Sequence, residues 1–231
     1  MTIGIRNVRG LITACLVGAA PAALPAQTIP SPYRHIEPAQ SVSLFAGYLS
    51  TSRGDLGLGM KSGPSFGVRY AGRFAAPVAG VVRLAMTPSE RTVYRRSDPN
   101  DLEAPLEALG DASAVILSAE VGGRLLLTGP RTWHSLAPYL EVTGGLISVS
   151  GSRIEAESEL ATNQVVDFGP AFAGGVALGT DWFLTDRIST GISVQGLLWR
   201  LSVPEGLSDT GSEEAEWTRN FSLSIGGAFH F

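Results

Sequence analysis

The sequence predicts an all-β protein, an eight-stranded antiparallel up-and-down transmembrane β-barrel. Three observations predict it. Stretch after stretch alternates apolar residues with small or polar ones at a period of two, which is the periodicity of a β-strand with one apolar face. Short turns and long loops alternate between these stretches, as they do in barrels that cross a bilayer. The alternation continues to the last residue of the chain, a phenylalanine.

The C-terminal segment shows this alternation most clearly. Its apolar face holds Phe221, Leu223, Ile225, Phe229 and Phe231, and Gly227 is the one gap. The opposite face carries Asn220, Ser222, Ser224, Gly226, Ala228 and His230, all small or polar. A soluble domain rarely ends on a strand whose apolar face includes a terminal aromatic ring. We therefore expect this segment to be the strand that closes the barrel.

Residues 1–26 have the layout of a secretory signal peptide. Arg6 and Arg9 supply the positive start, residues 11–20 form an apolar core, and small residues lead to Ala26, after which we expect cleavage. Cys15, the one cysteine, ends a short run that resembles a lipoprotein processing box, but almost no apolar core precedes it. Export without lipidation is therefore favoured. No later stretch approaches the ~18 apolar residues of a transmembrane helix.

The mature chain begins with a lead-in and the first three strands. Residues 27–39 contain three prolines, which cannot donate to a strand ladder, so we expect an extended periplasmic lead-in without pairing. Residues 40–231 are expected to form the barrel. Its first strands are placed at 41–49, 64–74 and 78–87, with a tight turn at 75–77 between the second and the third.

The later strands are separated by three long loops and two short turns. The loops are expected at 88–112, 150–164 and 202–217, and the strands at 113–127, 136–149, 166–180 and 188–201, before the C-terminal strand. Phe168 and Phe172 are placed on the outer face of the 166–180 strand, whose other face is all glycine and alanine. The turn at 181–187 holds Trp182 and Phe183, an aromatic pair suited to the membrane interface.

A soluble barrel, lipocalin-like or avidin-like, is the structural alternative. Such a barrel turns its apolar faces inward and carries more lysine and glutamate on the wet face. In this chain the non-apolar faces are mostly glycine, alanine and serine, which suits a cramped lumen. The composition fits one domain: 231 residues, of which 44% are hydrophobic and 16% charged, with 28 glycines. The membrane barrel is therefore preferred.

The mature chain resembles the small eight-stranded bacterial outer-membrane β-barrels exemplified by the OmpA transmembrane domain, OmpX and OmpW-like proteins. In that family a C-terminal phenylalanine preceded by alternating apolar residues is the assembly signal. The resemblance implies that Phe221, Leu223, Ile225, Phe229 and Phe231 are recognised by the barrel-assembly machinery. It also implies location in the outer membrane, both barrel termini in the periplasm, and outer-membrane lipid and lipopolysaccharide as partners.

Five ionisable residues fall on the face opposite the apolar stripes. They are Arg69, Arg83, Glu120, Arg124 and Glu141, on neighbouring strands and at similar heights. Isolated charges inside so narrow a barrel are costly, so we expect them to pair. The favoured interpretation is a structural ion-pair network that plugs the lumen. A gate or a catalytic acid/base pair is the alternative, but no nucleophile and histidine lie beside them in sequence.

The sequence offers little support for an enzyme. His35, His134 and His230 are the only histidines, and none stands in a recognisable triad order with a serine and a carboxylate. No spacing predicts a metal site, and no cofactor is expected. The net charge of −4 gives no reason to expect nucleic acid as a partner.

The long loops are acidic, and binding by such a barrel resides in its loops. Glu157 in the 150–164 loop and Asp209 in the 202–217 loop are examples. We interpret them as a solvated fringe, with recognition of a basic partner as the alternative. The function we expect is a non-enzymatic role in envelope integrity or surface interaction. Alternatives are a narrow channel for small or hydrophobic solutes, OmpW-like, and a lipid A-modifying enzyme.

Overall fold

The structure is a computed structural model that describes residues 31–36, 39–54, 57–98, 101, 104–160, 162–166, 168–208, 212 and 214–231. The chain divides into two units, Met1–Ser31 and Pro32–Phe231, and the second contains every strand listed below. The predicted signal peptide, Cys15 and Asp209 lie outside the described residues. Their assignments therefore stay predictions.

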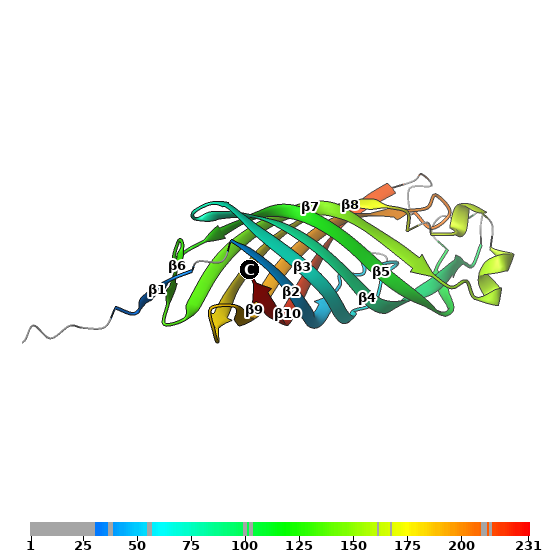
Figure 1. Cartoon of the computed structure of the whole chain (residues 1–231). Coiled ribbons are helices and arrows are strands. Elements are labelled where there is room, and N and C mark those ends of the chain that lie inside the picture. The colour runs from blue at the N-terminus through cyan, green and yellow to red at the C-terminus, as the bar shows by residue number, and fades with distance from the viewer. Residues whose placement is uncertain are drawn as a thin grey trace, which may run out of the picture. The chain divides into compact units, whose positions relative to one another are not determined.

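Eight strands of the described chain form one closed antiparallel barrel. They are β2 (Gln40–Ser50), β3 (Gly63–Ala75), β4 (Val78–Arg96), β5 (Leu106–Leu126), β7 (Leu136–Gly151), β8 (Ala171–Phe183), β9 (Ile188–Val203) and β10 (Glu214–His230). Each pairs with its neighbours in chain order, and β10 pairs with β2 to close the sheet, with Phe229 opposite Val42. Figure 1 shows the strands running obliquely around the barrel. The predicted fold class is confirmed.

Each of the eight strands carries a row of large apolar side chains on its outward face. Leu44 on β2, Phe172 on β8 and Ile225 on β10 are each more than 60% exposed, and the same face of every strand repeats the pattern. Water hydrates so wide a contiguous apolar belt poorly, whereas lipid chains cover it. The soluble alternative, with its apolar faces inward, is therefore wrong. Separately, no helix in the described part of the chain is long and apolar enough to cross a membrane.

The lead-in carries a short strand ladder, which the proline content did not predict. β1 (Tyr33–His35) pairs antiparallel with β6 (Arg131–Trp133), and β6 continues into β7. The prolines only flank this segment, so its three residues keep the N–H groups that pairing needs. Figure 1 places β1 and β6 at the end of the barrel that also holds the C-terminus. Short turns connect the strands at this end, at 76–77, 127–130 and 184–187.

The opposite end departs further from the sequence prediction. The segment 88–112 is not a long loop: β4 and β5 extend through most of it as a paired hairpin, with Arg91 opposite Ala112. The outer face of this extension meets water and its inner face carries the buried arginines Arg91 and Arg96, so polar residues occur on both faces and the alternation that marks a strand is lost. The 150–164 segment contains two short 3-10 helices, η1 (Glu155–Glu159) and η2 (Thr162–Gln164). β8 begins at Ala171, later than expected, because Pro170 precedes it and cannot donate.

Candidate functional site: the barrel lumen

The five predicted lumen residues all point into the barrel and are at most 8% exposed. The strand register explains why they gather there. Arg83 on β4 lies opposite Arg69 on β3 and Glu120 on β5. Four residues further along β5 toward the short-turn end, Arg124 lies opposite Glu141 on β7. Three arginines and two glutamates therefore share one layer of the lumen.

One half of this layer is organised around Glu141. Its Oε2 accepts hydrogen bonds from Arg124 Nε at 3.1 Å and Arg124 Nη2 at 3.0 Å, and lies 3.9 Å from Arg69 Nη1. Arg124 Nη1 also lies 3.3 Å from Asp181 Oδ2 on β8. Arg69 Nη1 donates to the Tyr139 hydroxyl at 2.7 Å. Arg69 on β3 is thus tied across the lumen to β7, and Arg124 is tied to the neighbouring strand β7 and to β8 beyond it.

The other half is organised around Gln195 on β9. Its side-chain oxygen accepts a hydrogen bond from Arg83, and its Nε2 donates to Glu120 Oε2 at 2.7 Å. Thr143 donates to the same glutamate oxygen, also at 2.7 Å. Arg83 and Glu120 therefore connect through the amide and form no ion pair with each other within 4 Å. Gln195 bridges β4 and β5 to the opposite wall of the barrel.

Aromatic rings and a glycine position the guanidinium groups. Arg124 lies over the Tyr139 ring at 3.8 Å from its centroid, and Arg83 lies over Phe45 at 4.4 Å. Both are cation–π contacts in a site that water barely reaches. Opposite them β8 is small: a Cβ on Gly179 would meet the Tyr139 ring at 2.5 Å. The small face of β8 thus makes room for the ring against which Arg124 stacks.

Sequence reasoning brought the five charged residues to one place but missed four of their partners. Alternation along their strands puts Tyr139 and Gln195 on the inner face, but neither carries a charge that would mark it as a member of this layer. Phe45 lies on the inner face of β2 between outward-facing residues. Asp181 was assigned to a turn. It faces the lumen because β8 continues as a strand to Phe183.

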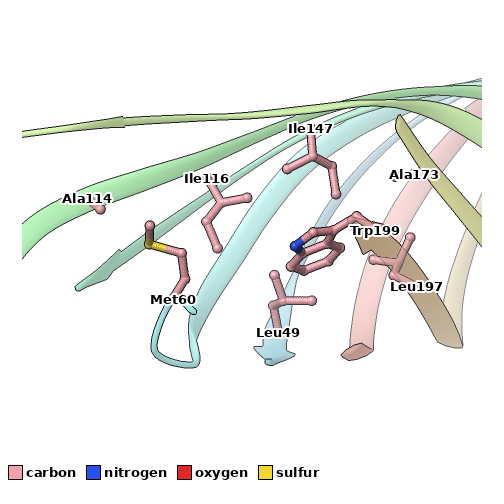
Figure 2. Packing of buried hydrophobic residues seen from close by; sticks show 8 residues of the cluster. All are labelled: Leu49, Met60, Ala114, Ile116, Ile147, Ala173, Leu197 and Trp199. Atoms are coloured by element: carbon pink, nitrogen blue, oxygen red, sulfur yellow. The ribbon is translucent and has the colours of Figure 1, made fainter. Parts of the chain in front are cut away.

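The lumen above the polar layer is apolar, which corrects the expectation of a lumen lined by glycine and serine. Eight buried residues form one cluster there: Leu49, Met60, Ala114, Ile116, Ile147, Ala173, Leu197 and Trp199. Figure 2 shows Trp199 among Leu49, Leu197 and Ile147, with Met60 beside Ile116. A second cluster, formed by Leu58, Leu201, Val203 and Leu207, lies toward the loops.

Strand β9 explains why alternation missed this apolar layer. From Leu197 onward the large apolar residues lie on the inner face, where Leu197, Trp199 and Leu201 are buried, while the outer face carries Leu198 and then Arg200. The apolar face of β9 thus changes sides along the strand, so one assignment made for the whole strand misses the apolar interior. The prediction for Phe168 is also wrong. It was expected on the lipid face, but it precedes β8 and packs against both interior clusters.

Two buried arginines bind the connecting segments at the loop end of the barrel. Arg91 on β4 holds Glu157 of η1 with Nη2 at 2.8 Å and 2.6 Å from its two carboxylate oxygens. Arg96 donates to the carbonyl oxygens of residues 206, 207 and 208. Leu207 beneath this contact is fully buried. Glu157 therefore belongs to a packed cap and is not part of a solvated fringe.

An exposed ion-pair cluster supports the extended hairpin on its outer side. Lys61 Nζ lies 2.6 Å from Asp111 Oδ2 and 3.1 Å from Glu90 Oε2. The hydrogen bond that Lys61 donates to Asp111, followed by the one that it donates to Glu90, raises the pKa of Lys61 above its ordinary value. The hydrogen bond from Lys61 and then the one from Thr92 lower the pKa of Asp111.

The short-turn end of the lumen is closed by the lead-in. Ile36 packs against Ala137 and Phe183 in a small buried cluster, and Arg73 Nη1 donates to the Ile36 carbonyl at 3.0 Å. Phe183 therefore lies inside the barrel, not at the membrane interface as expected, whereas Trp182 does face outward. A cavity of about 50 Å³, lined in part by Ile36, Arg124 and Asp181, lies between this closure and the polar layer.

One serine–histidine pair escaped the sequence analysis. The Ser189 hydroxyl and His230 Nε2 lie 2.7 Å apart, and the imidazole packs on the Phe183 ring. Ser189 is 1% exposed, and among the described residues no carboxylate hydrogen-bonds to the imidazole, so the pair lacks the third member of a triad. His35 and His134 lie apart from it in the β1–β6 region. No described cluster of three or more His, Cys, Asp or Glu residues could hold a metal ion.

Solved structures show where this architecture recurs. The chain is similar to the outer membrane protein OprG from Pseudomonas aeruginosa, with a TM-score of 0.53, 13% identity, and coverage of 84% of this chain and 97% of that one. It is also similar to Neisserial surface protein A, with a TM-score of 0.51, 14% identity, and coverage of 87% and 98%. No family model and no curated protein sequence matches the chain. Identities this low show the shared fold, that of a small outer-membrane β-barrel.

Proposed function

We propose that this chain, which has the fold of a small eight-stranded outer-membrane β-barrel, is a non-enzymatic envelope protein whose lumen is closed by its polar layer. The role is envelope integrity or interaction at the cell surface. The observation that carries the proposal is the chain of contacts from Arg69 through Glu141 and Arg124 to Asp181. It joins β3 to β8 across the lumen. A water-filled pore needs open space at this level, and these side chains fill it.

The orientation follows from the two unlike ends of the barrel. In transmembrane barrels the periplasmic turns are short and the extracellular loops are longer. The end with the 76–77, 127–130 and 184–187 turns also holds Phe231, so we place both barrel termini in the periplasm. Phe221, Leu223, Ile225, Phe229 and Phe231 line the outer face of β10, where the barrel-assembly machinery can read them. Export by residues 1–26 is part of this proposal.

Single-channel recording in planar bilayers tests the closed lumen. We expect no steady conductance from the refolded wild-type barrel. The Arg124→Ala/Glu141→Ala variant removes two side chains that span the layer, and we expect it to conduct. Arg95→Gln, at the exposed end of the β4–β5 hairpin, serves as the control and should stay closed. A steady wild-type conductance of the same size as that of the double variant would contradict the proposal.

A narrow route for apolar solutes is the second candidate function, and the apolar upper lumen favours it. A cavity of about 190 Å³ lies beside that cluster, where β8 has not yet begun, and is lined in part by Ile147, Phe168, Pro170 and Trp199. Ala171→Trp places a ring in this opening. If the route operates, cells that express the variant take up an apolar dye more slowly than wild-type cells do. The outward-facing control Ala119→Trp should leave uptake unchanged, and equal uptake in all strains rejects the route.

A lipid A-modifying enzyme is the least favoured function. The Ser189–His230 pair is buried at the end of the barrel that we place in the periplasm, away from the outer leaflet. We therefore expect an unchanged lipid A mass spectrum when the protein is overexpressed. A new lipid A species that disappears in the Ser189→Ala variant would reverse this assignment.

A further inference from the structure

Two arginines interrupt the apolar outer face of neighbouring strands. Arg200 on β9 and Arg219 on β10 are both exposed, on the side of the barrel that faces lipid. Arg200 lies opposite Trp217, and Arg219 lies opposite Leu198. Within the part of the chain that the structure describes, neither guanidinium has an ion-pair or hydrogen-bond partner, whereas Lys61, Arg91 and Arg124 all do. Two unpaired charges on a lipid-facing surface call for an external counter-charge.

Their height along the barrel indicates where that counter-charge lies. Ten residues separate Phe229, near the short-turn end, from Arg219. At ~3.3 Å per residue and a tilt of ~40°, that distance is roughly 25 Å along the barrel axis, which is the height of the apolar band. Trp217, 62% exposed, marks the aromatic girdle at the same level. The arginines therefore lie at the outer boundary of the hydrocarbon, among the lipid headgroups.

An apolar groove begins at Arg219, beside Arg200 on the neighbouring strand, and continues into the membrane. It has a volume of about 490 Å³ and is lined in part by Val142, Val176, Leu198 and Phe221, with Arg219 as its charged member. Its floor includes Gly174 and Gly196, which point outward without side chains. A Cβ on Gly174 meets nothing within 4 Å, and one on Gly196 meets only atoms at 3.9 Å and beyond. The groove is therefore open space at the surface of the sheet.

We propose that this groove and the two arginines form a binding site for a phosphorylated, multiply acylated glycolipid of the outer leaflet, lipopolysaccharide. An acyl chain lies over Gly174 and Gly196, and Arg200 and Arg219 bind the phosphate. The site rests on the proposed membrane orientation. Charge complementarity selects this occupant: an anionic headgroup neutralises both arginines at the height where phosphates lie.

Two features separate this site from the rest of the outer surface. A larger depression of about 650 Å³ around Phe66, Leu84 and Leu117 has no charged lining residue, so it offers nothing to a phosphate. A second copy of the chain is a poor occupant of the β9–β10 face. A two-fold contact across that face sets Arg200 and Arg219 against their own copies, and like charges repel.

Native mass spectrometry of the full-length refolded barrel tests the site. The micelles contain bis-phosphorylated lipid A, dephosphorylated lipid A or phosphatidylcholine in equal amounts. We expect the wild type to retain the bis-phosphorylated lipid preferentially. Arg200→Gln/Arg219→Gln should lose that preference by about thirtyfold, because each basic residue near an anionic lipid contributes roughly fivefold. Gly174→Leu/Gly196→Leu fills the groove and should lower retention of both lipid A forms.

Matched controls make the result decisive. Arg95→Gln/Arg153→Gln removes two exposed arginines from the loop end of the barrel, and Ala119→Leu adds a side chain to the other depression; both variants should retain lipid A as the wild type does. Inorganic phosphate at millimolar concentration should not compete, since it has no acyl chain. Equal retention by the wild type and the arginine variant, or an equal loss in the loop-arginine control, overturns the site. Heat-dependent gel mobility of each variant shows separately that the barrel is folded, so a failed barrel is not mistaken for a failed site.

Discussion

Arg124 on β5 and Glu141 on β7 face each other inside the barrel, and both Nε and Nη2 of the arginine bind the same carboxylate oxygen, Oε2, at 3.1 Å and 3.0 Å. Glu141 is 1% exposed. Removing one member of such a buried pair leaves the other as an uncompensated charge, whereas replacing both removes the charges together. Substitutions of this pair therefore measure most directly how much the polar layer stabilises the barrel.

Arg124→Leu should weaken the folded barrel and leave export intact. The expected loss is about 3–5 kcal/mol, because Glu141 and Asp181 lose their shared partner. The double variant Arg124→Leu/Glu141→Leu should recover part of that loss. The measurement is the temperature at which the folded band in a gel converts to the unfolded one. An unchanged midpoint in Arg124→Leu means that the pair has no structural role.

Gln195→Ala should also destabilise the barrel, although no charge is removed. Both Arg83 and Glu120 lose the amide that links them, and a buried polar group left without its partner costs about 1–3 kcal/mol. Ser193→Ala, on the same inner face of β9, is the control, since Ser193 bonds only to Ser224 among the described side chains. Urea unfolding of both variants in lipid vesicles compares the two losses. If the two losses of stability are equal, the link that Gln195 makes between Arg83 and Glu120 contributes nothing special to the stability of the barrel.

Trp199→Ala should empty part of the apolar layer of the upper lumen. Truncation of a buried aromatic residue costs roughly 3–5 kcal/mol, through lost burial and the cavity that remains. Trp217→Ala, on the lipid face, loses no interior packing and should unfold at nearly the wild-type denaturant concentration. A similar decrease in the two variants would show that the upper lumen is not packed as described.

The Lys61–Asp111 pair should give the extended hairpin a pH-dependent stability. Lys61 lowers the pKa of Asp111, so the carboxylate stabilises the folded hairpin above its ordinary pKa of 3.8, and this contribution is lost as the pH falls through the lower folded value. The pKa of Lys61 is raised, so its ammonium stays charged throughout this range. Asp111→Asn should therefore loosen the hairpin at neutral pH, with the difference disappearing in strong acid. NMR line shapes of the hairpin at both pH values test this, and a difference that persists in acid contradicts it.

Phe231→Ala should reduce assembly in the outer membrane without lowering the stability of barrels that do assemble. Phe231 is exposed on the outer face, and its ring stacks on that of Phe229. Phe74→Ala removes an outward aromatic ring from β3 and is the matched control. The amount of folded protein in outer-membrane fractions is the readout. Equal amounts for the two variants would argue against a special role for the terminal ring.

The alternation of side chains was sufficient to predict the barrel, because one face of each membrane strand meets hydrocarbon and the other does not. It placed Arg69, Glu120 and Glu141 inside for the same reason. Where that contrast disappears, the prediction fails. The inner face of the β4–β5 hairpin beyond the membrane carries Arg91 and Arg96, so the hairpin was taken for a loop, and the apolar face of β9 changes sides along the strand, so Trp199 was not assigned to the lumen.

The partners within the polar layer depend on register and reach, which the sequence does not display. Gln195 lies 75 residues from Glu120 along the chain, yet their side chains hydrogen-bond across the lumen. Asp181 joins Arg124 only because β8 continues to Phe183. The closure by Ile36 depends on the β1–β6 ladder, which begins one residue after a proline.

Quenching of tryptophan fluorescence by lipids with brominated acyl chains tests the inside-out arrangement most directly. Two variants each keep one tryptophan and replace the other three with phenylalanine. The single Trp182 faces outward and should be strongly quenched in brominated vesicles, while the single Trp199 lies among Leu49 and Leu197 and should be shielded. Equal quenching of the two, or stronger quenching of Trp199, would contradict the assignment of the two faces and with it the closed lumen.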